Sequence, residues 1–195
     1  MKISIITLSL ATCLAFSNSS CTRKVDRVGV EEVIDLSGRW NDTDSRLAAE
    51  ELTAEAILSS WITDFREENG KKPTVIVGLV RNKSHEHISA ETFIKDIEKE
   101  FVRSGRVSVV QGGEMREELR AERSDQQTNA SVSTVKRFGL EKGADFMLQG
   151  TINTIVDSYK RKKVVYYQID LELTHIQTNE KVWFGDKKIK KFVKN

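Results

Sequence analysis

The stretch VYYQIDLELT (residues 165–174) decides the fold, because apolar and polar side chains alternate along it without a break. An alternation with a period of two places one set of side chains on each face of a β-strand. The odd-numbered side chains are mainly apolar, and those between them carry hydroxyl, amide or carboxylate groups. The stretch therefore predicts a half-buried strand, with one face against a core and the other toward solvent.

The segments on either side of this stretch predict its partners in an antiparallel meander. Residues 146–155 alternate in the same way and predict the preceding strand. The basic segment from Tyr159 to Lys163 lies between the two strands and predicts a hairpin tip. Residues 178–180 predict a turn, after which residues 181–193 form the third strand.

The first half of the chain alternates helices with strands. The apolar run from Thr74 to Val80 predicts a strand, and its continuous branched residues favour burial on both faces. Residues 106–110 predict a second, short strand. One helix is predicted from about Ser45 to Glu68, with its stop at Asn69-Gly70, and another runs from Ser89 to Gly105 between the strands. This alternation is typical of parallel strands joined by crossover helices.

Helical spacing of apolar residues predicts which side of each helix is buried. Asp42, Thr43 and Asp44 are all suitable N-caps for the first helix. A charged helix is predicted after Gly112-Gly113, and a further short helix closes at Gly143. The predicted apolar faces of the four helices are, in turn, Leu47, Ala54, Leu58, Trp61 and Phe65, widened by Ala48, Ile57 and Ile62; then Phe93, Ile94, Ile97, Phe101 and Val102; then Met115 and Leu119; and last Val132, Val135, Phe138 and Leu140.

Together these elements predict an α/β fold in the order α-β-α-β-α-α-β-β-β. Parallel crossover units make up the first half of the sheet, and the antiparallel meander makes up the second. We therefore expect a single mixed β-sheet covered by helices, with the polar faces of its strands partly free.

The N-terminal segment has the layout of a lipoprotein signal peptide. Met1-Lys2 is positively charged, residues 3–16 are mainly apolar, and small polar residues lead to Cys21. We expect cleavage before Cys21 and acylation of its thiol. Cys13 is a poorer site, because the bulky Thr12 precedes it. An ordinary signal peptide with an incidental cysteine is the alternative.

Acylation of Cys21 divides the chain into three segments. We expect a signal peptide over residues 1–20, the lipidated cysteine with a short tether over residues 21–37, and the α/β domain over residues 38–195. A tether of this length reaches only some tens of ångströms, since an extended residue spans at most ~3.5 Å.

Composition narrows the function of the domain. The chain has 31 basic and 29 acidic residues and a net charge of +2, which gives no reason to expect nucleic acid as the partner. Its two cysteines, Cys13 and Cys21, both precede the domain. The domain therefore has no thiol for a disulfide, a nucleophile or a zinc cluster.

Few side chains are arranged for catalysis. Gly112-Gly113 lacks the Lys-Ser/Thr of a phosphate-binding loop. His85-Glu86-His87 is the one cluster with metal-ligand character, and we interpret it as a solvated loop. Helix capping explains residues 41–45 (NDTDS), which lack the later residues of a calcium loop. The basic run of residues 160–163 is a solvated tip or a contact for anionic headgroups, glycan or an acidic partner. We expect no enzyme activity, cofactor, metal or small-molecule substrate.

Four short segments carry a resemblance to a known family. They are LSGRWNDTDSR (36–46), VGLVRNKS (77–84), GADFMLQG (143–150) and TNEKVW (178–183). In this order, behind a cysteine that matches the lipidated position, they resemble the LpoB family of penicillin-binding-protein activators. The resemblance extends over about residues 36–192.

The resemblance implies a fold like the N-terminal domain of TolB and an outer-membrane lipoprotein whose domain lies in the periplasm. It implies docking on a peptidoglycan synthase, a bifunctional penicillin-binding protein. The docked lipoprotein is then a non-catalytic regulator of cell-wall synthesis. Enteric members have a long proline-rich tether, whereas the segment after Cys21 is short and has no proline before Pro73. The partner of this chain must therefore come closer to the membrane, or it is a different protein.

Two other function classes fit parts of the sequence. A CsgG-like secretion or envelope-assembly lipoprotein has a related core but needs extra amphipathic hairpins, and residues 146–155 and 165–173 are both needed for the domain sheet. An enzyme acting on cell-wall glycan needs two carboxylates beside a groove, which spacing alone does not test.

Overall fold

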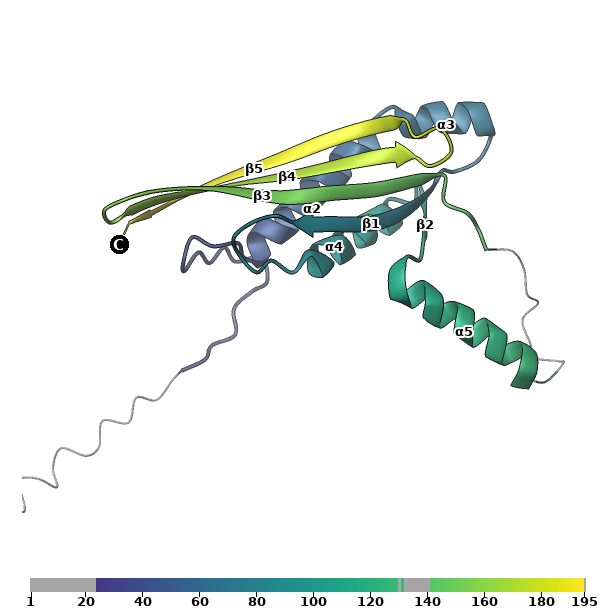
Figure 1. The fold of residues 1–195 in the computed structure, drawn as a ribbon, viewed down its shortest axis with the longest axis horizontal. Helices are drawn as coiled ribbons and strands as arrows, with labels where there is room; N and C mark the ends of the chain where they lie inside the picture. The colour runs from purple at the N-terminus through teal and green to yellow at the C-terminus, as the bar shows by residue number, and fades with distance from the viewer. Residues whose placement is uncertain (1–23, 130, 132–140, 195) are drawn as a thin grey trace, which may run out of the picture. The chain divides into compact units, whose positions relative to one another are not determined.

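The computed structural model describes residues 24–129, 131 and 141–194. The chain divides into two compact units, Met1–Glu32 and Val33–Asn195. In the described part of the first unit, the amide of Glu32 donates to the carbonyl of Gly29 in a turn. The described helices and strands belong to the second unit (Figure 1). They are, in chain order, α2 (Asp42–Leu58), α3 (Trp61–Asn69), β1 (Thr74–Asn82), α4 (Ala90–Ser104), β2 (Ser108–Val110), α5 (Gly113–Asn129), β3 (Phe146–Tyr159), β4 (Lys162–His175) and β5 (Lys181–Lys194).

The described strands form one mixed sheet in the order β2-β1-β3-β4-β5. β1 runs parallel to β2 and β3, whereas β3, β4 and β5 are antiparallel neighbours. The predicted mixed sheet, with crossover units first and a meander second, is therefore confirmed. The short helix predicted around Val132, Val135, Phe138 and Leu140 lies outside the described residues.

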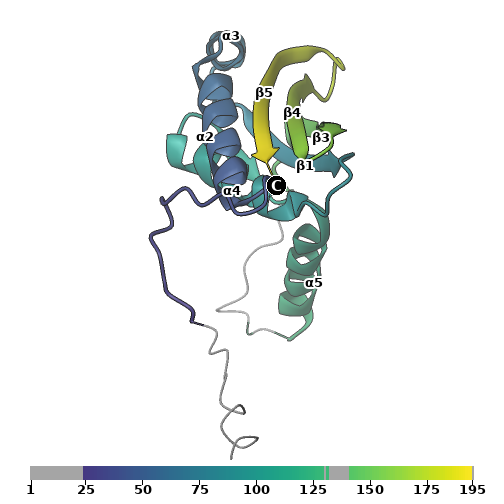
Figure 2. The same ribbon diagram turned by 90° about the vertical axis from the view of Figure 1, so that its left-hand side faces the viewer.

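Two helices cover one face of the sheet (Figure 2). α2 packs along α4 and against β5, and α4 packs against β1 and β2. The alternating apolar side chains of β4, from Val165 to Leu173, point into this layer, and each is at most 1 % exposed. Full burial of such a side chain stabilises the fold by about 1.5–3 kcal/mol. All core residues lie between Ala48 and Trp183, so the unit Val33–Asn195 has a complete core of its own.

The single long helix predicted from Ser45 to Glu68 is wrong, because the structure has two helices there. The backbone of Ser59 is extended, with ψ 156°, and it separates α2 from α3. The second helix ends as predicted at Gly70, which has φ 63° in the left-handed region that favours glycine. A break of this kind shifts the helical phase, so one apolar stripe does not continue through both helices.

The predicted apolar face of the first helix is wrong at Leu47, Ala54 and Leu58 of α2, although Ala48 is buried as predicted. Leu47 is 44 % exposed and Leu58 is 78 % exposed. α2 instead buries small side chains, because they let its backbone approach α4 and β5 closely. Gly185 of β5 leaves room for Leu52, the largest buried side chain of α2. The buried set of apolar residues on α2 is Ala48, Ala49, Leu52 and Ala56.

The cap of α2 also differs from the prediction. Asn41 is the N-cap, and its side chain accepts a hydrogen bond from the amide of Asp44 at 3.0 Å. Asp44 accepts in return from the amide of Asn41 at 3.0 Å. This reciprocal capping box satisfies two backbone donors, so Asp44 lies in the first turn and does not cap the helix itself.

The prediction that β1 is buried on both faces is also wrong. Val75 and Val77 are buried, but Leu79 is 66 % exposed. The register between β1 and β3 shifts between Val77 and Val80, so one extra residue bulges there. The apolar run of β1 therefore packs into the core on one side only, because no described helix covers the other face of the sheet.

α5 has no buried residue, although it spans Gly113–Asn129. Three of its arginines, Arg116, Arg120 and Arg123, form ion pairs with Glu141. The hydrogen bond from Arg120 lowers the pKa of the Glu141 carboxyl. Across the described ranges, no helix is long and apolar enough to cross a membrane.

Candidate functional site

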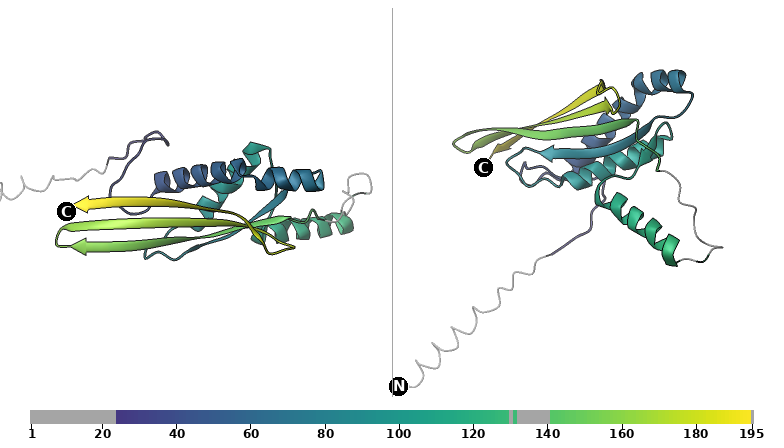
Figure 3. Two further views of the ribbon diagram at one scale, coloured as in Figure 1. Left: turned by 90° about the horizontal axis from the view of Figure 1, so that it is seen from above. Right: turned by 45° about the vertical axis from the view of Figure 1, so that its right-hand side comes forward.

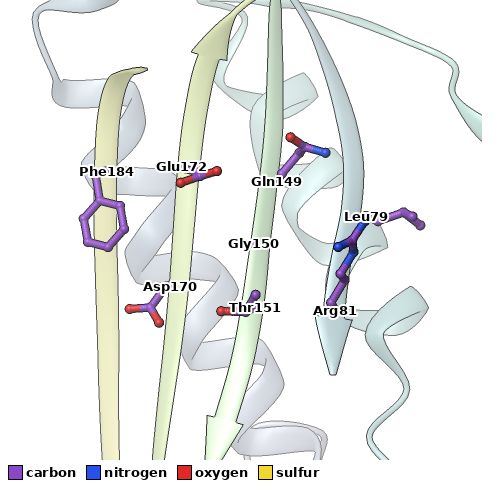
Figure 4. Close-up of a pocket in the computed structure, with 8 residues that line it drawn as sticks. All are labelled: Leu79, Arg81, Gln149, Gly150, Thr151, Asp170, Glu172 and Phe184. Carbon is purple, nitrogen blue, oxygen red and sulfur yellow. The ribbon is translucent and has the colours of Figure 1, made fainter. Parts of the chain in front are cut away.

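The face of the sheet opposite α2 and α4 is not covered by any described helix (Figure 3). We call it the open face, made of the outward side chains of β1, β3, β4 and β5. The strand register places these side chains in rows across the sheet. Two neighbouring rows contain, first, Gln149, Glu172 and Phe184 and, second, Arg81, Thr151 and Asp170 (Figure 4).

A shallow depression of about 290 Å³ lies among these two rows. Leu79 and Phe184 stand on either side of it, 66 % and 56 % exposed. Arg81 is exposed beside Leu79, and among the described residues its guanidinium has no ion-pair partner. Exposed apolar side chains and an arginine on a rigid sheet are typical of surfaces that bind proteins.

The carboxylates of the open face are held by their neighbours. Asp170 accepts a hydrogen bond from the side chain of Gln168 at 2.8 Å and lies 3.4 Å from that of Asn153. Asp186 forms an ion pair with Lys188 at 3.0 Å, and that hydrogen bond raises the pKa of Lys188. The face therefore combines fixed negative charges with apolar groups and the Arg81 cation.

A partly buried cluster joins the end of β5 to the segment that enters α2. The ammonium of Lys191 lies 2.6 Å from Asp44 and 2.8 Å from Asp35, and it donates to the carbonyl of Arg39 at 3.1 Å. We call these four residues the Lys191 clasp. Burial lowers the pKa of Lys191, but the hydrogen bonds to Asp35 and Asp44 outweigh it and leave the pKa raised. The clasp fixes where the N-terminal segment leaves the sheet.

Glu86 forms a second set of contacts that hold the N-terminal segment on the sheet. Its carboxylate accepts hydrogen bonds from the amide of Trp40 at 3.0 Å and from the hydroxyl of Tyr167 at 2.9 Å. The rings of Trp40 and Tyr167 also meet edge to face, with centroids 5.5 Å apart. His85 and His87 on either side of it are exposed, as a solvated loop predicts. The segment 36–46 that carries the resemblance is thus a structural junction.

Two other predicted features can be placed. Lys160 and Arg161 form the turn between β3 and β4, so the predicted basic hairpin tip is confirmed. Cys21, the one candidate site residue of the sequence, lies outside the described residues. Among residues 24–129 and 141–194, no group of three or more His, Cys, Asp or Glu side chains is placed to hold a metal.

Sequence reasoning missed Leu79, Arg81 and Phe184 as surface residues. One signal was available for Phe184, which follows Trp183 directly on a strand. Neighbouring side chains on a strand point to opposite faces, so one of two adjacent aromatic residues must face outward. Trp183 is 7 % exposed and takes the core side.

The comparison with family models decides the classification. A model described as "Peptidoglycan-synthase activator LpoB" matches residues 44–189, which is most of the chain. This chain belongs to the LpoB family. The LpoB match spans β1, β2, β3 and β4 and the first part of β5, which include the residues that line the depression on the open face. Of the Lys191 clasp, it includes Asp44. A search of curated protein sequences found no match.

Several solved structures are similar at low sequence identity. The LpoB C-terminal domain from Salmonella enterica is 15% identical, with a TM-score of 0.46 over 75% of this chain and 98% of that one. The LpoB C-terminal domain from Escherichia coli is 14% identical, with a TM-score of 0.47 and the same two coverages, 75% and 98%. Lipoprotein GNA1162 from Neisseria meningitidis is 14% identical, with a TM-score of 0.38 over 62% of this chain and 83% of that one.

Membership of the LpoB family makes the chain a peptidoglycan-synthase activator and a non-catalytic regulator. This agrees with the function expected from the four segments of the sequence. It favours the activator over the CsgG-like secretion lipoprotein and over a glycan-cleaving enzyme. The open face, with its exposed apolar groups and fixed charges, is the candidate surface for the activator's contact.

Proposed function

We propose that this chain is an envelope lipoprotein that docks its open face on a bifunctional penicillin-binding protein and thereby activates it. The LpoB family supplies the class of partner, because its members activate peptidoglycan synthases. The observation that carries the choice of surface is the depression between Leu79, Arg81 and Phe184.

The chemistry of this depression suits a protein partner. Leu79 and Phe184 offer apolar area that docking would remove from water. Arg81 can form a bidentate pair with a carboxylate of the partner. The strands beneath are hydrogen-bonded on both sides across β1, β3 and β4, so the surface is formed before the partner arrives and ordering it costs little.

The proposal places the domain near a membrane. Residues 1–20 act as a signal peptide, Cys21 carries the lipid anchor, residues 21–37 form the tether, and residues 38–195 form the periplasmic domain. The anchor lies in the outer membrane, as the family resemblance implies. The synthase then has to reach toward the lipoprotein, because the tether is short.

Reconstituted synthesis tests the docking face. Residues 22–195 are mixed with the organism's bifunctional penicillin-binding proteins, and glycan polymerisation and cross-linking are measured with lipid II as substrate. We expect stimulation by the unchanged domain and its loss in Arg81→Glu and Leu79→Ala. Both side chains are exposed, so the free energy of unfolding should stay within about 0.5 kcal/mol of the parent.

Matched controls separate the face from the rest of the surface. Arg103→Glu and Leu58→Ala make the same changes at exposed positions on the helical side of the domain. They should keep full stimulation. Full stimulation by Arg81→Glu and Leu79→Ala would show that docking uses another surface. Stimulation of no synthase would contradict the proposed partner.

Metabolic labelling tests the anchor. Cells that express the full chain are given a labelled fatty acid, and the protein is recovered from membrane fractions. We expect label in the parent and in Cys13→Ser, but none in Cys21→Ser. Label that persists in Cys21→Ser would exclude this cysteine as the acylated residue.

A further inference from the structure

The β3–β4 turn and the end of β5 lie at the end of the sheet opposite α3 (Figure 1). Lysine and arginine are concentrated in these two segments. Lys160 and Arg161 form the β3–β4 turn, and Lys162 and Lys163 follow at the start of β4. The end of β5 lies directly beside them, since Lys162 pairs with Lys194 in the strand register. We call the following six residues the basic tip: Lys160, Arg161, Lys162, Lys163, Lys190 and Lys194.

The charge of the basic tip is not neutralised within the domain. In the part of the chain that the structure describes, none of its six side chains forms an ion pair, although many lysines elsewhere on the sheet do. Asp157 is the acidic residue nearest to the tip along β3, and it is exposed. Among the described side chains, this places six cations beside one carboxylate, and their positive potential favours an anionic partner.

Exposed apolar side chains accompany these charges. Tyr159 is 71 % exposed, Phe192 is 57 % exposed and Ile155 is 67 % exposed. Lys160 lies 5.3 Å from the ring centroid of Tyr159, and Lys194 lies 5.7 Å from that of Phe192. Aromatic rings next to lysines suit a membrane interface, where rings enter the headgroup layer and ammonium groups meet phosphates.

The tether begins at the same end of the sheet. The Lys191 clasp holds Asp35 and the carbonyl of Arg39 beside the last residues of β5. Gly38 lies against Val193, one residue before Lys194. Asp35 lies fourteen positions after Cys21 in the sequence. Even when fully extended, this segment spans at most ~50 Å.

We infer that the basic tip binds anionic phospholipid headgroups of the membrane that holds the Cys21 anchor. This inference rests on the proposed function for the anchor alone. A short tether keeps the tip at a high local concentration near that membrane, so a weak surface contact is enough. Each basic residue near an anionic bilayer strengthens binding about fivefold.

Binding at the tip leaves the proposed docking depression free. Phe184 pairs with Glu172 of β4, ten residues from Lys162 along that strand. At about 3.3 Å per residue this separates them by roughly 33 Å. The domain would thus contact the membrane through the basic tip at one end of the sheet. Its open face would remain free to contact the synthase.

Vesicle sedimentation tests the inference with residues 22–195, which hold the complete core but no lipid. The protein is mixed with vesicles of phosphatidylcholine alone or of phosphatidylcholine with phosphatidylglycerol. We expect binding to the second kind only, weakened by added salt because the contact is electrostatic. Lys160→Gln with Arg161→Gln should reduce partitioning on the order of 25-fold, from two losses of about fivefold each.

The matched control removes the same charge elsewhere. Arg66→Gln with Arg103→Gln changes two exposed arginines at the other end of the domain, and it should leave vesicle binding unchanged. Equal loss in both double variants, or no binding to anionic vesicles by the parent, would overturn the inference. Binding to purified peptidoglycan sacculi in place of vesicles would assign the tip to glycan and overturn it too.

The same variants keep this inference apart from the proposed function. Lys160→Gln with Arg161→Gln should stimulate the synthase fully in detergent solution, where no membrane surface is needed. Arg81→Glu should lose stimulation yet bind anionic vesicles like the parent. If vesicle binding fails while stimulation is normal, the inferred membrane contact is contradicted and the proposed docking face is not affected.

Discussion

The ammonium of Lys191 lies 2.6 Å from a carboxylate oxygen of Asp44, although 147 positions separate the two residues in the numbering of the chain. Only 10% and 9% of the two side chains are exposed. The contact joins the last strand of the sheet to the first turn of α2, and Asp35 of the incoming tether shares the same ammonium. One cation thus holds three parts of the domain together.

Replacing Lys191 should destabilise the domain strongly. Lys191→Met leaves the carboxylates of Asp44 and Asp35 without their cation, and Asp44 stays buried. Loss of one partner from a buried ion pair costs about 2–4 kcal/mol, because the remaining charge is uncompensated. Urea unfolding followed by circular dichroism measures the change.

Lys187 on the same strand is the matched control. It pairs with Glu51, whose side chain is 58% exposed. An exposed pair contributes at most about 1 kcal/mol, so Lys187→Met should cost far less than Lys191→Met. Equal losses in the two variants would mean that burial of the clasp does not govern its strength.

Alkaline pH should destabilise the domain through Tyr167. Burial raises the pKa of its hydroxyl, and the hydrogen bond to Glu86 raises it further above the ordinary value of 10.0. A pKa raised by folding means that the stabilisation is complete below pH 10 and is lost as the pH rises above it. The raised pKa of Lys191 acts in the same direction above its ordinary value of 10.5.

Tyr167→Phe isolates the tyrosine contribution. The variant leaves Glu86 without one hydrogen bond, so it should be about 1–2 kcal/mol less stable at neutral pH. Its free energy of unfolding should then fall less steeply than that of the parent above pH 10, as urea titrations at several pH values would show. Parallel pH curves for the two proteins would rule out Tyr167 as the titrating group.

A side chain at position 38 should disturb the junction. Gly38 has φ +67°, and an added Cβ would collide with Cγ2 of Val193. The left-handed backbone alone costs about 1–2 kcal/mol for alanine, and the collision adds to that. Gly38→Ala should therefore lower the thermal unfolding midpoint, and a second change, Val193→Ala, should recover only the part due to the collision. Complete recovery would mean that the backbone conformation carries no strain.

Truncation of Phe184 should weaken docking and spare the fold. The ring is 56 % exposed, so Phe184→Ala removes little core packing. If the ring is a central anchor, affinity for the synthase should fall at least about tenfold, as is usual for such residues. Surface plasmon resonance measures the affinity. Phe192→Ala, at the far end of the same strand, is the control and should bind the synthase like the parent.

Loss of Glu141 should loosen α5. This helix buries no side chain, and its arginines converge on that one carboxylate. Glu141→Gln should lower the hydrogen-exchange protection of residues 113–129 while the sheet keeps its protection. Because the pKa of Glu141 is lowered, the parent should keep this protection at the ordinary value of 4.5 and lose it only at lower pH.

The sequence by itself determined the features that depend on local periodicity. The alternation in residues 165–174 predicted the buried side of β4, and the basic run before it predicted the hairpin turn. Gly70 and Gly105 marked helix ends because both take left-handed backbone, which other residues adopt at a cost. Such signals need no knowledge of distant parts of the chain.

Only the tertiary structure decided which faces meet. Leu47 and Leu58 of α2 face solvent, because close packing against β5 favours small side chains on the core side. Leu52 is buried there because Gly185 leaves room for it. Strand register places Arg81 in one row with Asp170, and no local pattern joins residues so far apart.

The lysines of β5 also differ in ways that only the tertiary structure decides. Lys187, Lys190 and Lys191 look equivalent in the sequence, yet one forms an exposed pair, one belongs to the basic tip and one is enclosed by carboxylates. Their chemistry follows from burial and from the charges that other elements bring near them. Those are properties of the packed molecule, because water screens the same charges in an isolated strand.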